Sequence, residues 1–280
     1  MAFKKHFLCF IFLFVLLFPL QGSVVKIESF KQIESTLESL DSNALVVIDV
    51  DEVMLTDQDL ILKPMGDPLK FQIFNEYYIE AKSEREKEEV SKVLSLSLLL
   101  SQKALLEEDL PKMVTSLQKR KIKVIALTSC PTKSFGFIED LERWRLNHMR
   151  QFGIHLERSF PCLKRFLIEG LASQNIPMPI FNRGVLFTEG FSKADVLASF
   201  LKKVKMNPSR VVFIDDLSRN LQQMEVKLAK MKIPHSGFHY KDQKIEVSPD
   251  EKVARFQFEY LFKNKKWLSD EEASSSLKNL

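Results

Sequence analysis

Three short apolar runs, separated by helical patterns, constrain the fold of this chain more than any other feature of its sequence. Ala44-Leu45-Val46-Val47-Ile48 is an unbroken β-prone run, and similar runs lie at 122–127 and 210–214. Continuous apolar strands are typical of parallel sheets that are covered on both faces. Helical spacing follows at 137–152 and 217–230, so strands alternate with helices. The pattern predicts an α/β fold with a doubly wound parallel sheet.

Two longer stretches interrupt this alternation and predict the domain organisation. About seventy residues separate the first and second apolar runs, which is too many for one crossover helix, and they include helical stretches at 69–82 and 86–108. A second stretch, about 143–182, is broken by prolines. A helical pattern at 253–262 is followed by a polar end. We therefore expect a core at 27–56 and 116–262 with a smaller insert at about 143–182, a helical cap at 57–115, and a loose C-terminal tail at 263–280.

The first 22 residues have the pattern of a secretory signal peptide. Lys4 and Lys5 precede a charge-free run at 7–20, and the small residues Gly22 and Ser23 follow it. The alternative is an uncleaved anchor, because the span between Lys5 and Lys26 is roughly long enough to cross a bilayer. Both alternatives predict that the rest of the chain is exported, to the periplasm or the medium, or held at the membrane by this segment.

Composition excludes several classes of protein. The chain has 280 residues, of which 45% are hydrophobic and 28% charged, as in an ordinary globular protein. The net charge of +4 and the absence of a long basic run give no reason to expect binding to nucleic acid. Three cysteines are too few for a disulfide scaffold, and we expect Cys130 and Cys162 to be free thiols.

Acidic residues follow two of the apolar runs. Asp49-Val50-Asp51-Glu52-Val53 comes directly after the first run, and Asp215-Asp216 after the third, with Asn220 four residues later. Strands of an open α/β sheet present their carboxyl ends to one ligand-binding edge. Carboxylates gathered there would repel one another unless a cation neutralised them, and Mg²⁺ prefers such ligands. A single Asp-x-Asp could be an ordinary acidic loop, but the repetition at a second strand favours a metal site.

Hydroxyl and lysine side chains occur at two further positions of the same kind. Thr128 and Ser129 end the second run, where they could hydrogen-bond a phosphoryl oxygen or cap a helix. Lys193 opens the helical stretch 194–204, where the helix dipole gives a cation no advantage. A bound phosphate would explain this lysine, although for the residue taken alone a solvated side chain is the simpler interpretation.

Taken together and in this order, the four segments resemble the motifs of the haloacid dehalogenase (HAD) superfamily. Asp49-Val50-Asp51-Glu52-Val53 resembles its first motif, Thr128 the second, Lys193 the third, and Asp215-Asp216 with Asn220 the acidic fourth. Within the superfamily the chain looks most like exported bacterial HAD-type proteins of poorly defined function. The secreted class B and class C acid phosphatases are more distantly similar.

The resemblance implies an Mg²⁺-dependent phosphatase that hydrolyses a small-molecule phosphomonoester. It implies that Asp49 is the nucleophile and that Asp51 is the general acid and then the general base. It further implies that Thr128, Ser129 and Lys193 bind the phosphoryl oxygens. The remaining implied roles concern the metal, with Asp49, Asp51 (through its carbonyl), Asp215 and Asp216 as ligands and Asn220 as their support.

Two other kinds of function stay open from the sequence. One is a HAD-like binding protein without turnover, and the other is a membrane-tethered protein that binds a partner. Trp144, with Arg143, Arg145 and His148 around it, lies in a helical pattern; we interpret these as packing residues, with the alternative that some of them line the substrate side. His235 and His239 lie in a segment that is expected to be a strand, which argues against a paired metal site.

Overall fold

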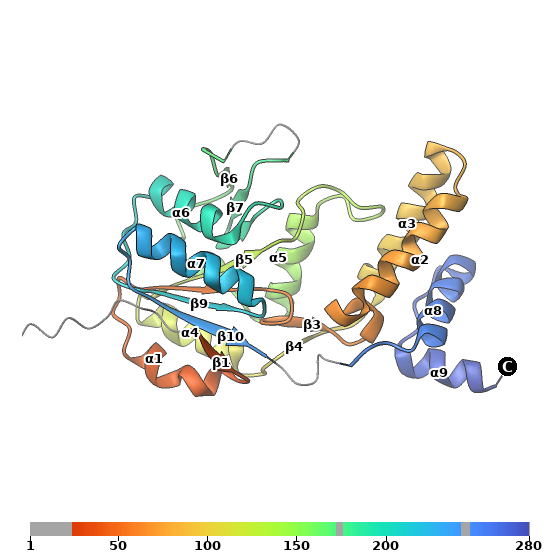
Figure 1. Ribbon diagram of the computed structural model, residues 1–280, viewed down its shortest axis with the longest axis horizontal. Helices are drawn as coiled ribbons and strands as arrows, with labels where there is room; N and C mark the ends of the chain where they lie inside the picture. Colours follow the sequence, from red (N-terminus) through yellow and green to blue (C-terminus); the bar gives the residue numbers. More distant parts are fainter. Residues whose placement is uncertain (1–23, 172–175, 242–246, 280) are drawn as a thin grey trace, which may run out of the picture.

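The computed structural model describes residues 24–171, 176–241 and 247–279. Residues 1–23, and with them almost the whole predicted signal peptide or anchor, lie outside this part of the chain. None of the helices in the described ranges has the length and apolar character needed to cross a membrane. Figure 1 shows a sheet covered by helices at one end of the molecule and a separate group of helices at the other.

One mixed sheet organises the larger part. In the described residues it has eight strands. Six neighbouring strands pair in parallel, and the last two at one edge are joined to them and to each other by antiparallel pairing. Their spatial order is β1 (Val25–Ile27), β10 (His235–Tyr240), β9 (Val211–Asp215), β2 (Leu45–Ile48), β5 (Lys123–Thr128), β8 (Val185–Phe187), β7 (Ile180–Asn182) and β6 (Phe166–Leu167). The predicted α/β fold class is confirmed. The three apolar runs are the three central strands β2, β5 and β9.

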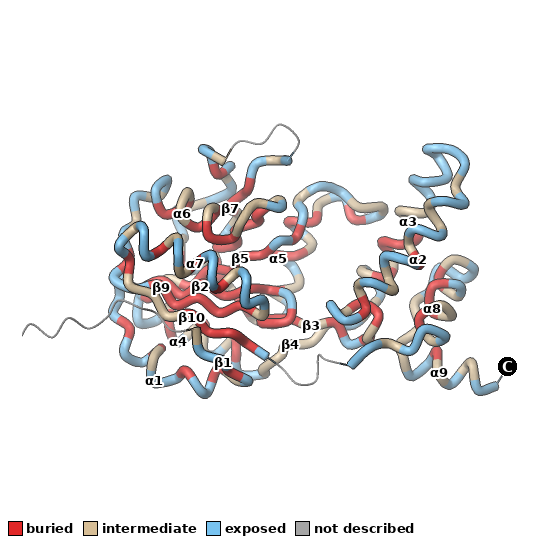
Figure 2. Tube along the Cα trace, viewed as in Figure 1, coloured by how far each residue is buried: buried red, intermediate tan, exposed pale blue. Residues whose placement is uncertain are grey.

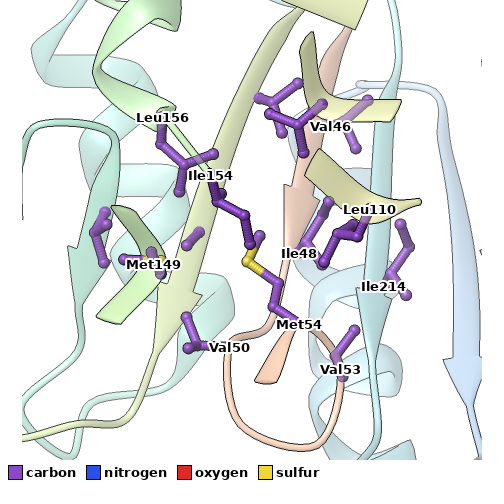
Figure 3. Close-up of a cluster of buried hydrophobic side chains, with 14 of the residues drawn as sticks. Val46, Ile48, Val50, Val53, Met54, Leu110, Met149, Ile154, Leu156 and Ile214 are labelled. Carbon is purple, nitrogen blue, oxygen red and sulfur yellow. The ribbon is translucent and has the colours of Figure 1, made fainter. Parts of the chain in front are cut away.

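Alternate residues of the central strands pack on opposite faces of the sheet. Val46 and Ile48 of β2 lie in a cluster with the helices of one face, whereas Leu45 and Val47 lie in a second cluster with the helices of the other. Figure 3 shows Val46 and Ile48 grouped with Leu110 in the first cluster. The helices of the first face are α1 (Glu34–Glu38), α4 (Leu110–Lys119) and α5 (Leu141–Gln151), and those of the second are α6 (Lys193–Lys203) and α7 (Ser218–Lys230).

Four helices form a separate unit, which we call the helical module (Figure 1). Its core joins buried side chains from two segments that are far apart in the sequence: Ile73 and Leu94 pack in one cluster with Phe258 and Leu261. Short strands β3 (Leu55–Asp57) and β4 (Lys103–Leu105) pair antiparallel and connect the module to the sheet. The module consists of α2 (Asp67–Glu80), α3 (Glu84–Leu100), α8 (Glu251–Asn264) and α9 (Asp270–Lys278).

The structure corrects two of the predicted boundaries at the C-terminus. Residues 263–280 are not a loose tail, because α9 has a capping box at Ser269 and a fully buried Ala273. The stretch 251–262 does not belong to the core around the sheet, since α8 packs against α2 and α3. Both errors have one physical cause: a helical pattern shows that a helix has an apolar face but does not identify its partner.

Two further boundaries move by part of a helix. The predicted cap at 57–115 includes the start of α4, but Leu110 and Val114 pack against the sheet. The predicted insert at about 143–182 includes most of α5, which also packs on the sheet through Leu146 and Met149. Four 3-10 helices complete the described structure, at Phe30–Ile33, Leu60–Leu62, Pro64–Gly66 and Leu156–Ser159. Figure 2 shows that the sheet is the most continuously buried region of the molecule.

Candidate active site

Three aspartates meet at the carboxyl edge of the two central strands β2 and β9. These strands pair in parallel with Ile48 opposite Ile214, so Asp49 and Asp215 follow them at the same level. The backbone N–H of Asp49 donates to the carbonyl of Ile214 at 2.9 Å, which fixes this register. One carboxylate oxygen from each of Asp49, Asp215 and Asp216 lies within 4.8 Å of the others. The sheet register therefore creates the acidic cluster.

Lys193 lies between two of these acids. Its ammonium is 2.6 Å from Oδ2 of Asp49 and 2.7 Å from Oδ2 of Asp215. Lys193 is the first residue of α6 and is buried, so its charge is neutralised by side chains more than by water. Three carboxylates and one ammonium leave two formal negative charges in the cluster. A divalent cation would balance this charge, and carboxylate oxygens are suitable ligands for Mg²⁺.

Asp215 is held rigidly inside the protein. Its Oδ1 accepts hydrogen bonds from Nδ2 of Asn220 at 2.8 Å and from the backbone N–H of Leu217 at 2.9 Å. Its Oδ2 accepts one from Lys193, and the residue has no exposed surface. Asn220 lies in the first turn of α7, five residues after Asp215, and this position lets its amide fold back onto the carboxylate. Asp216 is partly exposed, so of the adjacent pair it is the one more accessible to a ligand.

Burial has a strong effect on the protonation of the cluster. It raises the pKa of Asp49 well above its ordinary value, while Lys193 opposes this shift and Asp215 adds to it. Burial, followed by repulsion from Asp215, raises the pKa of Asp216 to about 6. Burial acts to lower the pKa of Lys193, but Asp49 and Asp215 outweigh burial and raise it. Neutralisation by a cation would remove the cost of holding these carboxylates ionised.

Thr128 and Ser129 follow the strand on the other side of β2. β5 pairs with β2 in parallel with Ala126 opposite Ile48, so Thr128 ends its strand close to the level of Val50. Oγ1 of Thr128 is buried and accepts a hydrogen bond of 3.1 Å from the backbone N–H of Cys130. Ser129 is exposed. Thr128 therefore ends the strand that neighbours Asp49 with a buried hydroxyl, and Ser129 follows it with an exposed side chain.

Asp51 is not part of the acidic cluster. Its carboxylate instead forms an ion pair with Arg145, at 2.8 Å from Nη1 to Oδ1 and 3.1 Å from Nη2 to Oδ2. We expected Asp49, Asp51, Asp215 and Asp216 to converge on one crevice. The structure brings Asp49, Asp215 and Asp216 within 4.8 Å of one another, and the Asp51 carboxylate lies outside this group of three. Because Asp49 and Asp51 are two residues apart just beyond the strand, the turn after β2 directs them to different partners.

Sequence reasoning missed two residues next to this site. Arg145 was interpreted as a packing residue, but it lies between Leu141 and Met149 on the buried stripe of α5. A charged side chain at a position with that spacing needs a partner, and this is the signal that could have identified it. His239 does lie in a strand, as predicted, and its Nε2 donates to the carbonyl oxygen of Asp216 at 2.8 Å.

One family model matches most of this chain. The model of the family described as "Protein of unknown function (DUF2608)" matches residues 26–274. Uncharacterized protein RP296 of Rickettsia prowazekii is 23% identical over 88% of this chain and 87% of its own length. An uncharacterized protein of Rickettsia felis is 25% identical over 86% of this chain and 84% of its own. The solved structure of a HAD family hydrolase from Salmonella enterica serovar Typhi covers 72% of this chain and 70% of its own, with 11% identity and a TM-score of 0.32.

Proposed function

We propose that this chain, which belongs to the DUF2608 family, is an Mg²⁺-dependent phosphatase that hydrolyses a phosphomonoester through an aspartyl-phosphate. One observation carries the proposal: Lys193 bridges Asp49 and Asp215, with Asp216 beside them, at the carboxyl edge of a parallel sheet. A nucleophile, a phosphate-binding cation and acidic ligands for a metal ion would be needed together for this chemistry. The two formal negative charges of the cluster also support a divalent cation.

The first step of the proposed reaction is attack by Asp49. One carboxylate oxygen of Asp49 forms a bond to phosphorus while the bond to the ester oxygen breaks, and Asp51 gives its proton to that oxygen. The hydrogen bond of 2.7 Å from the backbone N–H of Val50 to Oδ1 holds the Asp49 carboxylate in one orientation. Lys193 lies within contact of Oδ2 of Asp49 and would stabilise the phosphoryl oxygens as charge develops on them.

The second step restores the enzyme. Asp51 takes a proton from water, the water oxygen bonds to phosphorus, and the bond between phosphorus and Asp49 breaks to release inorganic phosphate. The hydroxyls of Thr128 and Ser129 would donate hydrogen bonds to phosphoryl oxygens in both steps. Mg²⁺, held by carboxylates of Asp49 and Asp216 and by the carbonyl of Asp51, with Asp215 directly or through water, would supply positive charge that screens the phosphate from the acids.

The helical module favours a small or medium substrate. It is joined to the sheet by β3, which begins at Leu55, only a few residues after Asp51, and by β4, which returns the chain from α3. A unit of this size next to the site would limit access for a large phosphoprotein more than for a small molecule. The proposed substrate is therefore a small-molecule phosphomonoester, and no nucleic-acid partner is proposed.

Export is a further part of the proposed function, and it is supported by the pattern of residues 1–22 alone. Mass spectrometry of the protein recovered from its native host would test it. A mature chain that starts near Ser23 or Val24 is the expected result, in the periplasm or the medium. An intact amino terminus in the membrane fraction would favour the anchor.

The decisive experiment is a hydrolysis assay of the purified chain on a panel of phosphomonoesters, with Mg²⁺ and with EDTA. We expect release of inorganic phosphate that EDTA abolishes and added Mg²⁺ restores. Absence of turnover on the whole panel would instead favour a binding protein that retains the fold, or a tethered protein whose function lies in partner binding.

A further inference from the structure

Arg145 is a buried arginine in a position where helix packing alone would favour an apolar residue. Leu141 and Met149, four residues before and after it, are both buried in the core cluster beside the sheet. The Arg145 side chain is only 7% exposed, and neither its Nε nor its Nη1 makes a hydrogen bond among the described residues. Burying a guanidinium costs free energy, and replacement of a buried ion pair by apolar side chains is often neutral or stabilising. Its contribution to packing therefore does not explain it.

The contact that Arg145 does make is specific in geometry. Its Nη2 donates a hydrogen bond of 3.1 Å to Oδ2 of Asp51, and its Nη1 lies 2.8 Å from Oδ1 as an ion pair. A two-point contact of this kind fixes the plane of a carboxylate as well as its position, which a lysine could not do. The partners are 94 residues apart in sequence, so this orientation depends on the docking of α5 against the turn after β2.

Asp51 remains accessible while it is held. Its side chain is 50% exposed, in contrast to the buried Asp49. A residue that transfers a proton to a leaving group needs an accessible oxygen and a fixed orientation, because proton transfer depends on hydrogen-bond geometry. The guanidinium would also stabilise the carboxylate that forms as Asp51 gives up its proton.

We propose that Arg145 is a positioning residue that orients the Asp51 carboxylate for proton transfer to the leaving oxygen of the substrate. The proposal rests on the proposed phosphatase function and deepens it. It assigns to α5 a role in the chemistry that acts through Asp51, without contact between Arg145 and the phosphate. This role predicts that substitution of Arg145 lowers kcat/KM most for substrates whose leaving group most needs a proton.

The test compares two esters of similar shape, phenyl phosphate and 4-nitrophenyl phosphate. Phenolate is the poorer leaving group and needs protonation, whereas 4-nitrophenolate needs it much less. General acids contribute about a hundredfold or more to rate, so Arg145→Met should lower kcat/KM on phenyl phosphate by at least about tenfold. On 4-nitrophenyl phosphate the loss should stay below about threefold. Arg145→Lys, which keeps the charge but not the two-point contact, should show a smaller loss with the same dependence on the ester.

Two further variants identify the cause of the loss. Arg165→Met is the matched control, because Arg165 also forms a two-point ion pair with α5, through Glu142, but does not contact Asp51. It should leave both kcat/KM values within about twofold, because Arg165 is half-exposed and neither it nor the buried Glu142 shares a contact with Asp51. The double variant Asp51→Asn with Arg145→Met should hydrolyse phenyl phosphate no more slowly than Asp51→Asn alone. When two residues act as a unit, the effects of substituting them do not add.

The proposal is overturned if Arg145→Met loses the same factor on both esters, which would indicate substrate binding or general damage to the fold. It is also overturned if the losses of the double variant multiply, or if neither Arg145 variant folds by thermal melting while Arg165→Met does. Failure of the phosphatase assignment is a separate outcome, since the wild-type chain would then hydrolyse neither ester.

Discussion

The carboxylate of Asp59 accepts a hydrogen bond of 2.7 Å from the indole nitrogen of Trp267. The same carboxylate accepts the backbone N–H of Asp270 at 3.0 Å, and Asp59 is buried. Asp270 in turn accepts hydrogen bonds from the backbone N–H of Leu60 and from Nε2 of Gln257. These contacts join the segment before α2 to the segment between α8 and α9. The C-terminal helices are therefore an integral part of the helical module.

Replacement of Trp267 by Phe should destabilise the helical module. The change removes the indole donor and leaves one oxygen of the buried Asp59 without this partner, which should cost about 1–3 kcal/mol. The measurement is urea unfolding followed by circular dichroism at a wavelength that reports helix. Trp144→Phe is the control, because the Trp144 indole nitrogen has no hydrogen-bond partner in the described structure. An equal loss of stability in both variants would contradict this account.

The sheet and the acidic cluster could be predicted from the sequence because their signals are local. The run that forms β2 is apolar on both faces, and Asp49 follows it immediately. The same reasoning applies to β9 and Asp215. Parallel strands then bring the two acids to one edge without any further information. Lys193 was found through the order of the motifs, and the structure brings it into contact with both acids.

The interactions that the sequence did not predict join distant segments. The helical pattern of α8 shows which residues are buried but not that Phe258 packs with Ile73 rather than on the sheet. The partner of Arg145 is equally invisible in the sequence, because Asp51 was already assigned to the site and the spacing of α5 carries no information about the turn after β2. The direction of the Asp51 side chain is set by this tertiary contact. No local rule could have supplied it.

Asp49→Asn should abolish hydrolysis and leave the fold intact. The amide is nearly isosteric with the carboxylate, but it cannot attack phosphorus, so kcat should fall by at least about a thousandfold. Release of inorganic phosphate from 4-nitrophenyl phosphate measures the loss, and a thermal melt checks the fold. Asp109→Asn, a change to an exposed acid at the start of α4, is the control and should retain full activity. Retention of more than about a tenth of wild-type turnover in Asp49→Asn would exclude Asp49 as the nucleophile.

His148 should contribute to loss of stability in weak acid. Burial, with Lys103 and Arg145 nearby, lowers the pKa of its imidazole to about 4 in the folded protein. In the unfolded chain the imidazole titrates near its ordinary value of about 6.5, so the unfolded state binds more protons between these values. The contribution of His148 to the free energy of unfolding is therefore at its maximum above about pH 6.5 and decreases as the pH falls towards 4. The melting temperature of wild type relative to His148→Gln should therefore decrease between pH 7.5 and 5. A constant difference over this range would contradict the assignment.

Mg²⁺ should stabilise the folded chain through Asp216. A ligand that binds only the native state raises its apparent stability by mass action, by about 2.7 kcal/mol at a hundred times the dissociation constant. Asp49, Asp215 and Asp216 are the carboxylates of the cluster, and Asp216 is the most exposed of the three. Asp216→Asn should keep the fold and lose most of the increase in melting temperature that Mg²⁺ produces in wild type, whereas Asp109→Asn should keep it. Thermal melts of the three proteins at rising Mg²⁺ provide the measurement. An equal response in Asp216→Asn and wild type would mean that the ion binds elsewhere, and the proposed phosphatase would lose the support of its acidic cluster.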